Sequence, residues 1–535
     1  MRLNPSIRSK TYPVFLVLVS LLLYLPGLGA RDLWAPVEPR YAEIARVMLA
    51  KGEWVVPTIN GAVYTDKPIL YFWLVLIGSR LFGGVNEWTV RLPSAFSGLG
   101  LALTTYFLGR DLVGARVGFM AALVLSSSAR VLWEARWAHT DMAFTFFFTL
   151  SMYFFVRAIF KIGGPREFVL ACASVGLATL TKGLIGVVLP GLVLLTFVAV
   201  RRDWRALLQW RLASGILVFF LVAAPWFASV DLATEGEWLK VFLLTHHIQR
   251  YTSGLGHRQP FYYYFTNLPP DFLPWTIFVV PAIFSYRSRI KALMEPMDLF
   301  LFLWFALIFL FFSFSDTKRA LYLLPLFPPA ALFVARYFDH LISGEVSQDA
   351  LYRWTAYLSF NLLWIGSLSL PVAAWFFQSE VFVLSLPLAL LLAGGGLATV
   401  VSIWLKLPHV VFFTTALTVS LGMLYTSVRI LPFVDRYKSP KPFALEVRGV
   451  VPLRQPLYIY ADSMNDFNFY MEREVIPVLS SKAELEDMVA QMKTAYILIR
   501  ERDFKKLEIE EKAAILAEGR VGDKNWHLVR LTDRQ

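Results

Sequence analysis

Apolar stretches long enough to cross a lipid bilayer recur along this 535-residue chain from residue 13 to residue 430. A helix crosses the hydrocarbon core with about 20 predominantly apolar residues. Windows of that length predict about thirteen membrane-spanning helices. They lie at 13–29, 89–109, 115–133, 141–160, 167–182, 184–200, 208–229, 271–286, 297–314, 320–337, 354–377, 381–404 and 410–430. The stretch 69–82 is apolar but short, and it could form a re-entrant or interfacial helix. The pattern predicts an all-α polytopic membrane body over residues 1–430.

The composition agrees with a membrane body followed by a small soluble domain. The chain is 57% hydrophobic and 17% charged, against roughly 45–50% and about 25% in soluble proteins. The net charge of +12 does not indicate a nucleic-acid partner, because much of it lies in short loops between spans, where it sets orientation. The single cysteine, Cys172, excludes a disulfide within the chain and a cysteine-based metal site.

The distribution of Lys and Arg predicts the orientation. Arg2, Arg8 and Lys10 precede the first apolar stretch, which we expect to remain as a signal anchor with a cytoplasmic N-terminus, although Gly29-Ala30 could be a cleavage site. Most basic loops then lie inside. The basic exceptions on the outside are 30–88, Thr181-Lys182, 230–270 and 315–319, and an anionic phosphate substrate would explain them. An odd number of spans places residues 431–535 outside.

The tail from residue 431 to residue 535 has the pattern of a small α/β domain. Residues 456–461, 495–500 and 527–532 resemble strands. Residues 481–492 have helical spacing, with Ser481 as the expected cap and Glu484 and Glu486 near the start. The acidic residues Asp462, Asp466 and Glu472 are interpreted as solvated surface instead of a second active site.

Residues 31–68 form the most informative outside segment. Apolar side chains in it follow helical spacing at Tyr41, Ile44, Ala45, Met48 and Leu49. With Arg40, Glu43 and Arg46 pointing elsewhere, this spacing predicts an amphipathic helix lying on the outer membrane surface. A plain surface strut is the alternative for the helix considered alone. The candidate functional residues of the segment are Glu38, Arg40, Tyr41, Asp66 and Lys67.

A second outside cluster precedes the span that begins near residue 141. It contains Glu134, Arg136, His139 and Asp141. A carboxylate at the membrane boundary is costly unless it is paired, so Asp141 is a candidate active-site residue. The alternative is a helix cap, since Thr140 and Asp141 both suit that position.

Three further outside clusters are basic. Lys182 follows Thr181 in a turn between two spans, where a lone lysine could also snorkel to the headgroups. Residues 245–265 interleave aromatics with His246, His247, Arg250, His257 and Arg258, a mixture suited to a phosphate and a sugar ring. The irregular spacing of these histidines does not support a metal site. Residues 315–329 contribute Lys318, Arg319 and Tyr322.

Together the five clusters offer a few carboxylates and many cations beside a bilayer. A polyprenyl-phosphate sugar donor needs cations for the phosphate that becomes the leaving group. It also needs a carboxylate that can deprotonate the acceptor hydroxyl. The sequence therefore favours a glycosyltransferase that takes its sugar from such a carrier. A transporter or flippase of lipid-linked sugars is the main alternative, although no inverted repeat is visible; a non-catalytic scaffold would leave the charge clustering unexplained.

The same segments resemble the family of membrane glycosyltransferases that contains the lipid A aminoarabinose transferase, and more distantly the protein O-mannosyltransferases. The resemblance covers most of residues 10–435. It is carried by Glu38-Pro39-Arg40-Tyr41-Ala42-Glu43-Ile44, Asp66-Lys67-Pro68, Arg91-Leu92-Pro93-Ser94, Thr140-Asp141-Met142, Leu180-Thr181-Lys182-Gly183 and Lys318 to Pro325.

The resemblance implies a C-type glycosyltransferase fold with juxtamembrane helices in the first outside loop and an outside α/β tail. It implies an undecaprenyl-phosphate-type donor, a bacterial inner-membrane location, and lipid A, another glycan or a protein as acceptor. It makes Asp141 an active-site carboxylate, assigns Lys67, Arg40, Arg250 and Lys318 to the donor phosphate, and lets Tyr322 line the site. Tyr41, Lys182 and His247 complete the expected substrate contacts. No cofactor is firmly predicted, and a divalent metal stays an open alternative that no ligand motif supports.

One departure from the family concerns the first outside loop. The family carries an Asp-Glu pair where this chain reads Val37-Glu38. A valine can neither accept a proton nor bind a metal. We therefore expect Glu38, Asp141 or Asp66 to take the acid–base role, or the chain to be inactive or to carry out altered chemistry.

Overall fold

The structure of this chain is a computed structural model. It describes residues 5–207, 210–249, 251, 258–287, 295–346, 348, 350–377, 379–462, 465–492, 494–507, 509 and 513–532. The chain forms two compact units. The first comprises Met1–Pro26, Asp66–Tyr71 and Ser94–Ile430, and the second comprises Gly27–Thr65, Phe72–Pro93 and Leu431–Gln535. The first outside loop, which the sequence analysis grouped with the membrane body, falls mostly in the second unit.

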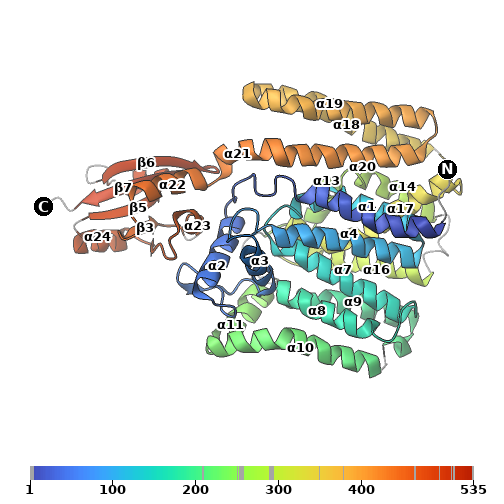
Figure 1. Cartoon of the computed structure of the whole chain (residues 1–535), viewed down its shortest axis with the longest axis horizontal. Helices are drawn as coiled ribbons and strands as arrows, with labels where there is room; N and C mark the ends of the chain where they lie inside the picture. Colours follow the sequence, from blue (N-terminus) through green and yellow to red (C-terminus); the bar gives the residue numbers. More distant parts are fainter. Residues whose placement is uncertain are drawn as a thin grey trace. The chain divides into compact units, whose positions relative to one another are not determined.

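The first unit is helical, and its long helices run side by side (Figure 1). In chain order, the main helical elements of this unit, long and short, are α1 (Pro5–Tyr24), α4 (Leu92–Leu112), α5 (Ala115–Ser126), α6 (Ala129–Glu134), α7 (Thr140–Ile159), α8 (Glu167–Lys182), α9 (Ile185–Arg201), α10 (Trp210–Ala233), α11 (Glu237–Lys240), η2 (Val241–Gln249), α13 (Tyr263–Asp271), α14 (Thr276–Arg287), α16 (Pro296–Phe314), η3 (Ala320–Leu326), α17 (Phe327–Ser343), α18 (Ala350–Phe377), α19 (Ser379–Trp404), α20 (Pro408–Tyr425) and η4 (Thr426–Ile430).

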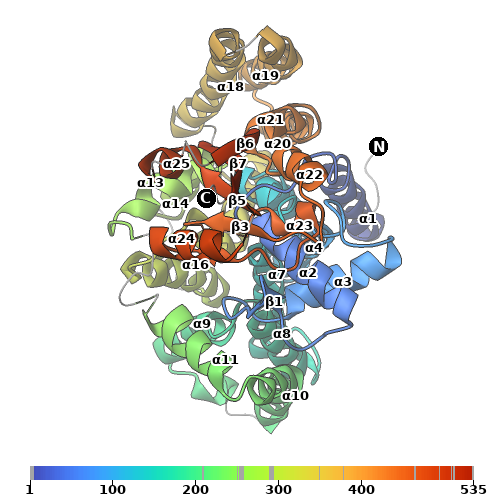
Figure 2. The same cartoon turned by 90° about the vertical axis from the view of Figure 1, so that its left-hand side faces the viewer.

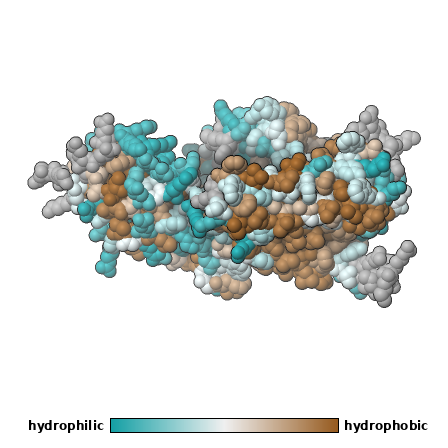
Figure 3. Space-filling view, turned by 90° about the horizontal axis from the view of Figure 1, so that it is seen from above, coloured by the Kyte–Doolittle hydropathy of each residue, from teal (hydrophilic) through white to brown (hydrophobic). Residues whose placement is uncertain are grey.

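Every predicted span overlaps one of these helices. Among the described residues, seven helices are both long and apolar enough to cross a membrane, and four shorter apolar helices accompany them. Hydrophobic side chains cover much of the visible surface over the helices of the first unit (Figure 3). The multi-pass helical body is thus confirmed, whereas the number thirteen stays a prediction.

Two predicted spans are not the single helices that the sequence suggested. The stretch 115–133 breaks between α5 and α6, because the hydroxyls of Ser127 and Ser128 bond to carbonyl oxygens one turn back and the amide of Ala129 donates to the carbonyl of Leu273. The stretch 320–337 begins as the 3₁₀ segment η3, since Pro325 and the prolines that follow it cannot donate backbone hydrogen bonds.

The second unit combines a five-stranded sheet with short helices (Figure 2). Its elements are α2 (Val37–Lys51), β1 (Thr58–Ile59), β2 (Ala62–Val63), most of α3 (Leu70–Leu81), α21 (Leu431–Lys438), α22 (Lys441–Val450), β3 (Leu457–Tyr460), α23 (Asn468–Met471), β4 (Val478–Leu479), α24 (Lys482–Gln491), β5 (Thr494–Arg500), α25 (Glu501–Leu507), β6 (Ala513–Val521) and β7 (Lys524–Thr532).

The strand order is β4-β3-β5-β7-β6, parallel from β4 to β5 and antiparallel from β5 to β6. Alternate side chains of β5 and β7, including Ile497 and Val529, enter a core shared with α24 and α25. The predicted strands and the predicted helix are confirmed, and Ser481 accepts from the amide of Glu484 as expected. The expectation that Asp462 and Asp466 are solvated is wrong, because both are buried.

Helix α2 has the predicted position but not the predicted amphipathic exposure. The apolar Tyr41, Ile44 and Met48 are buried together with Glu38 on the same face, and so is Glu43 on another side of the helix. Arg46 neutralises Glu43 through two hydrogen bonds of 2.7 Å, which allows that face to be covered as well. The helix packs against β1 and α23. The predicted location of α2 on the outer membrane surface stays a prediction.

Candidate functional site

The first unit contains a pocket in which several of the predicted site residues meet. Its lining comes from the segment before α3, the α8–α9 turn, η2 and nearby Tyr251, the end of α16 with the loop that follows it, and η3. The lining residues are Asp66, Lys67, Lys182, Ile185, His246, Tyr251, Phe311, Phe312, Ser315, Thr317 and Tyr322. Four predicted residues (Asp66, Lys67, Lys182 and Tyr322), separated by up to 256 positions in the sequence, thus share one pocket.

An ion pair between α7 and α8 fixes the lysine of this pocket. The carboxylate of Asp141 binds the ammonium of Lys182 through Oδ1, and the Nδ1 atom of His139 contacts its other oxygen. The Asp141 side chain is 1% exposed and that of Lys182 is 9% exposed. No side chain caps α7, so the cap role considered for Asp141 is not what the structure shows. The expectation that Lys182 snorkels as a lone charge is likewise not met.

Aromatic rings enclose the ammonium of Lys182 on the pocket side. Its Nζ atom lies 4.7 Å from the ring centroid of Tyr322 and 5.2 Å from that of Phe144. Ring faces attract cations, so these contacts hold the charge in a defined direction. Lys67 and Arg319 lie within electrostatic range of the same ammonium. The arrangement concentrates positive charge at one end of the pocket.

Asp66 is the one carboxylate among the pocket-lining residues. Its Oδ1 atom lies 3.2 Å from Nζ of Lys67 and 3.3 Å from Nδ1 of His246. The Asp66 side chain is 25% exposed, whereas Asp141 is enclosed. Asp66 is therefore accessible to a ligand in the pocket, and Asp141 acts on the pocket through Lys182.

A second buried carboxylate lies behind Asp141. Glu134, at the end of α6, is 3% exposed and accepts a 3.4 Å hydrogen bond from Arg130. Burial raises the pKa of Glu134, His139 lowers it, and the charge of Asp141 raises it again. Arg130 also donates to Asp271 at 2.6 Å. None of these three groups is part of the pocket lining.

Lys318 is buried beside the pocket but does not line it. Its ammonium donates to the carbonyl oxygens of Gln259 (3.1 Å) and Ser315. Burial lowers the pKa of Lys318, against the attraction of Asp316. The lysine joins residues 258–259 to the 315–317 loop, where Arg258 and Thr317 also form a β-bridge. Its predicted contact with the donor phosphate stays a prediction.

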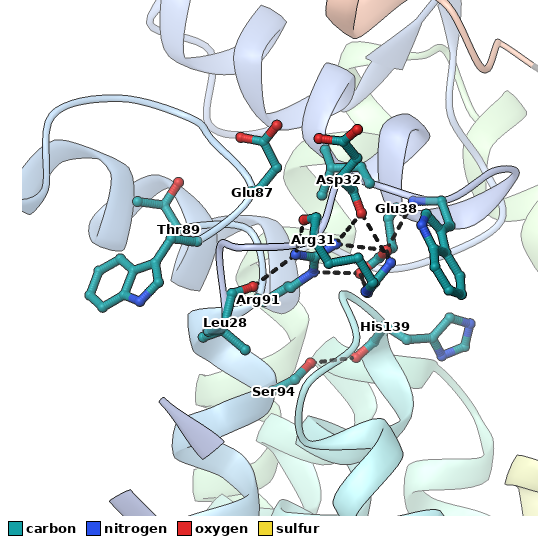
Figure 4. Close-up of polar contacts among 12 residues, drawn as sticks. Leu28, Arg31, Asp32, Glu38, Glu87, Thr89, Arg91, Ser94 and His139 are labelled. Atoms are coloured by element: carbon teal, nitrogen blue, oxygen red, sulfur yellow. Dashed lines mark hydrogen bonds and ion pairs between the residues drawn. The ribbon is translucent and has the colours of Figure 1, made fainter. Parts of the chain in front are cut away.

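In the second unit, Glu38 is the centre of an ionic cluster. The guanidinium groups of Arg31 and Arg91 converge on its carboxylate (Figure 4) at 2.7–3.0 Å, and the amide of Trp34 donates at 3.0 Å. Glu38 is completely buried. Burial alone would raise its pKa, but the two arginines lower it to about 2. A carboxylate so fully bonded is a poor proton acceptor.

Arg91 extends this cluster to the backbone. It donates to the carbonyl oxygens of Leu28 (2.8 Å), Arg31 (2.7 Å) and Asp32 (2.7 Å). The motif around Arg91 that carries the family resemblance is thus a structural clasp on the start of the first loop. Ser94, three residues later and in the first unit, donates at 3.2 Å to the carbonyl of His139 (Figure 4).

Arg40 and Tyr41, also in the second unit, contact protein groups. The Tyr41 ring is 2% exposed and meets Phe72 edge-on at 5.2 Å. Arg40 lies within electrostatic range of the buried Asp466. Burial and the neighbouring Asp462 raise the pKa of Asp466 to about 7, while Arg40 and Lys524 lower it. Substrate contacts by Arg40 and Tyr41 stay predictions.

Two predicted residues cannot be placed. Arg250 lies outside the described residues, as does the side chain of His247. His246 and His139 belong to the site although they were not chosen as site residues. Adjacent histidines gave no signal for choosing His246 over His247, because the choice depends on the π-helical turn of η2. Within the described parts of the chain, no group of three metal-ligating side chains lies together.

Comparison with protein families matches residues 9–238 to the family described as dolichyl-phosphate-mannose-protein mannosyltransferase. An uncharacterized protein of Aquifex aeolicus is 30% identical over 462 residues, which cover 85% of this chain and 86% of that protein. The undecaprenyl phosphate-α-4-amino-4-deoxy-L-arabinose arabinosyl transferase of Pectobacterium atrosepticum is 34% identical over 371 residues. These cover 68% of this chain and 65% of the transferase.

Solved structures share the fold. ArnT from Cupriavidus metallidurans, bound to undecaprenyl phosphate, superposes with a TM-score of 0.78 at 24% identity, covering 96% of this chain and 97% of that one. The oligosaccharyltransferase of Archaeoglobus fulgidus has a TM-score of 0.53 at 13% identity, covering 92% and 69%. At these identities the likeness establishes the architecture of the chain.

Proposed function

Because this chain belongs to the family of membrane glycosyltransferases that includes the undecaprenyl phosphate-α-4-amino-4-deoxy-L-arabinose arabinosyl transferases, we propose that it moves a sugar from a polyprenyl-phosphate carrier to an acceptor in the bacterial envelope. The observation that carries this proposal is the pocket that joins Lys67 and Lys182 to Asp66. Two ammonium groups and one carboxylate leave the lining with an excess of positive charge, which suits a phosphate ligand.

The donor phosphate binds at the end of the pocket where Lys182 points. Asp141 keeps the Lys182 ammonium charged and fixed, and the ring of Tyr322 limits its direction. Lys67, which lines the same pocket, supplies the second cation. Both cations act more strongly as the sugar leaves, because negative charge then develops on the phosphate oxygen. Asp141 is thus a positioning residue in this scheme.

Asp66 is the general base. Its carboxylate is accessible and lies beside His246, so it can receive the proton of an acceptor hydroxyl. The hydroxyl oxygen then bonds to the anomeric carbon, the bond from that carbon to the phosphate oxygen breaks, and the electron pair leaves with the polyprenyl phosphate. The displacement inverts the anomeric carbon. Glu38 is assigned to structure, because two arginines and a backbone amide already saturate its carboxylate.

The proposed topology has about thirteen spans with the N-terminus in the cytoplasm and the pocket and residues 431–535 outside. Basic short loops inside and the basic exceptions around the pocket support this orientation. The acceptor is lipid A, another glycan or a protein. The names of the relatives suggest 4-amino-4-deoxy-L-arabinose as the sugar. Val37 stands where the family has an aspartate and cannot accept a proton. In this proposal Asp66 therefore takes that role.

The test is mass spectrometry of lipid A and other envelope glycans from cells with the gene, without it, and with Lys182→Met. Purified protein given a polyprenyl-phosphate-linked sugar should also release free polyprenyl phosphate. Loss of one defined sugar in both altered strains, together with that release, would establish the transferase and identify its product. Unchanged glycans and no released carrier lipid in the wild type would overturn it. A flippase would move the intact donor without releasing the carrier.

A further inference from the structure

A groove in the α18–α19 hairpin lies outside the pocket described above. The two helices lie side by side in Figures 1 and 2 and contact the rest of the first unit through α14 and α20. The volume of the groove is about 730 Å³, within the roughly 300–1,000 Å³ usual for ligand sites. Its lining residues are Ala350, Arg353, Trp354, Tyr357, Phe360, Asn361, Val400 and Trp404.

The mouth of the groove is basic. Arg353 is exposed at the first turn of α18 and is the only charged residue of the lining. Lys406, just after α19, is also exposed, and its carbonyl accepts a 3.1 Å hydrogen bond from the side chain of Gln348. That bond brings the end of α19 to the start of α18. Two cations therefore lie at the same end of the hairpin.

Aromatic rings form the walls beside these cations. The side chains of Trp354 and Trp404 are 75% and 71% exposed. The indole N–H of Trp404 donates to the hydroxyl of Tyr357 at 3.2 Å, which orients both rings. Tryptophan and tyrosine favour the layer of lipid headgroups, where one end of the ring is apolar and the other meets water. The mouth thus has the chemistry of the membrane interface.

Beyond the mouth, polar and apolar side chains line the groove side by side. Arg353, Tyr357 and Asn361 follow one another at four-residue spacing, so they form a stripe about 12 Å long on α18. Phe360 and Val400 face the same groove. A cationic mouth that leads into a groove with both polar and apolar side chains suits a phospholipid, with its phosphate at the mouth and its glycerol region and acyl chain in the groove.

We propose that this groove binds an anionic phospholipid of the surrounding bilayer, with its phosphate at Arg353 and Lys406 and an acyl chain along Phe360 and Val400. Basic pockets between membrane helices bind such headgroups. A zwitterionic lipid adds an ammonium group that the two cations repel, so the site discriminates by net charge. In the proposed topology this end of the hairpin faces the cytoplasm. The inference does not depend on the sugar-transfer chemistry.

The test is native mass spectrometry of the full-length detergent-purified protein titrated with phosphatidylglycerol or phosphatidylethanolamine of the same acyl chains. We expect tighter binding of phosphatidylglycerol. Arg353→Gln with Lys406→Gln should weaken it about 10-fold or more. The matched control is Arg201→Gln with Arg202→Gln, which removes two exposed cations at the end of α9. That control should bind phosphatidylglycerol like the wild type.

A second measurement uses the wild-type protein, so its result does not depend on whether the variants fold. A photoactivatable phosphatidylglycerol should crosslink to residues 353–361 and 400–404 of the wild-type protein, and excess phosphatidylglycerol should compete while phosphatidylethanolamine does not. Equal binding of the two lipids, equal loss in the control variant, or crosslinks confined to other helices would each overturn the proposal. A dimer that forms through this face and excludes lipid would also overturn it.

Discussion

Lys182 at the end of α8 and Asp141 at the start of α7 form a buried ion pair, and the lysine of this pair also lines the pocket. Its partner does not. The pair therefore divides two tasks: Lys182 presents a charge to a ligand, and Asp141 with His139 holds that charge in place.

Replacing either partner of this pair should destabilise the protein more than replacing both. Asp141→Asn leaves the ammonium buried without its counter-charge, which costs about 3–5 kcal/mol in other buried pairs. Lys182→Met leaves Asp141 with His139 alone. The double variant should recover part of the loss, and thermal unfolding in detergent measures the coupling. Strictly additive losses would contradict a direct pair.

Lys182→Met should also weaken binding of undecaprenyl phosphate by about 10-fold or more, because one charge-assisted contact to the phosphate is lost. The control is Lys240→Met, an exposed lysine of the same unit. Equilibrium binding of the carrier lipid to purified protein provides the measurement. Equal affinity in the wild type and both variants would place the phosphate elsewhere.

Asp66→Asn should lower kcat by about 100- to 10,000-fold, the range expected for loss of a general base. Affinity for the donor should be maintained, since the substitution removes a negative charge from a site for an anion. Glu235→Gln, an exposed carboxylate of the same unit, is the control for charge. If Asp66→Asn kept the wild-type kcat, another carboxylate would have to be the general base.

Glu38→Gln should act on stability. Its pKa of about 2 in the folded protein lies below the ordinary value of 4.5. The stabilisation is therefore complete above about pH 4.5 and is lost as the pH falls toward 2, by about 3 kcal/mol in total. Thermal unfolding at pH 7 should show a lower Tm for this variant, whereas exposed Glu446→Gln should match the wild type. An unchanged Tm would contradict the structural role.

Asp466→Asn should stabilise the protein at alkaline pH. Burial and Asp462 raise the pKa of Asp466 from 3.8 to about 7. A raised pKa contributes stability that is complete below pH 3.8 and is lost as the pH rises through 7, up to about 4 kcal/mol. The Tm of the variant should exceed that of the wild type at pH 8 and approach it at pH 5. Exposed Asp487→Asn should leave the Tm unchanged at both values.

The helical body was predictable because a helix that crosses a membrane needs a long apolar stretch, and such stretches are visible directly in the sequence. The breaks within the predicted spans were harder to recognise in the sequence. Ser127 and Ser128 end α5 through hydroxyl bonds that any helix could also tolerate. In the tail, strands with alternating apolar residues were found, but the two-residue strand β4 is too short to produce a pattern.

The candidate site was predictable in part for a physical reason. A buried carboxylate such as Asp141 requires a partner, but the choice of Lys182 depends on how α7 packs on α8. The same holds for Glu38, whose partners Arg31 and Arg91 lie 7 and 53 residues away. Charge alone marks such residues as important. Only the contacts separate those that hold the structure from those that line the pocket.

The clasp of Arg91 on residues 28–38 fixes the two ends of a loop that runs from residue 39 to residue 90. Once the ends of a loop are held, its length hardly matters to stability, because doubling it costs only about 0.6 kcal/mol. Exposed positions of this loop, such as residues 81–83, can therefore lengthen or change, whereas Asp66 and Lys67 within it are constrained by their place in the pocket. The loop thus combines fixed ends and fixed pocket residues with a short exposed stretch in which insertions would leave both unchanged.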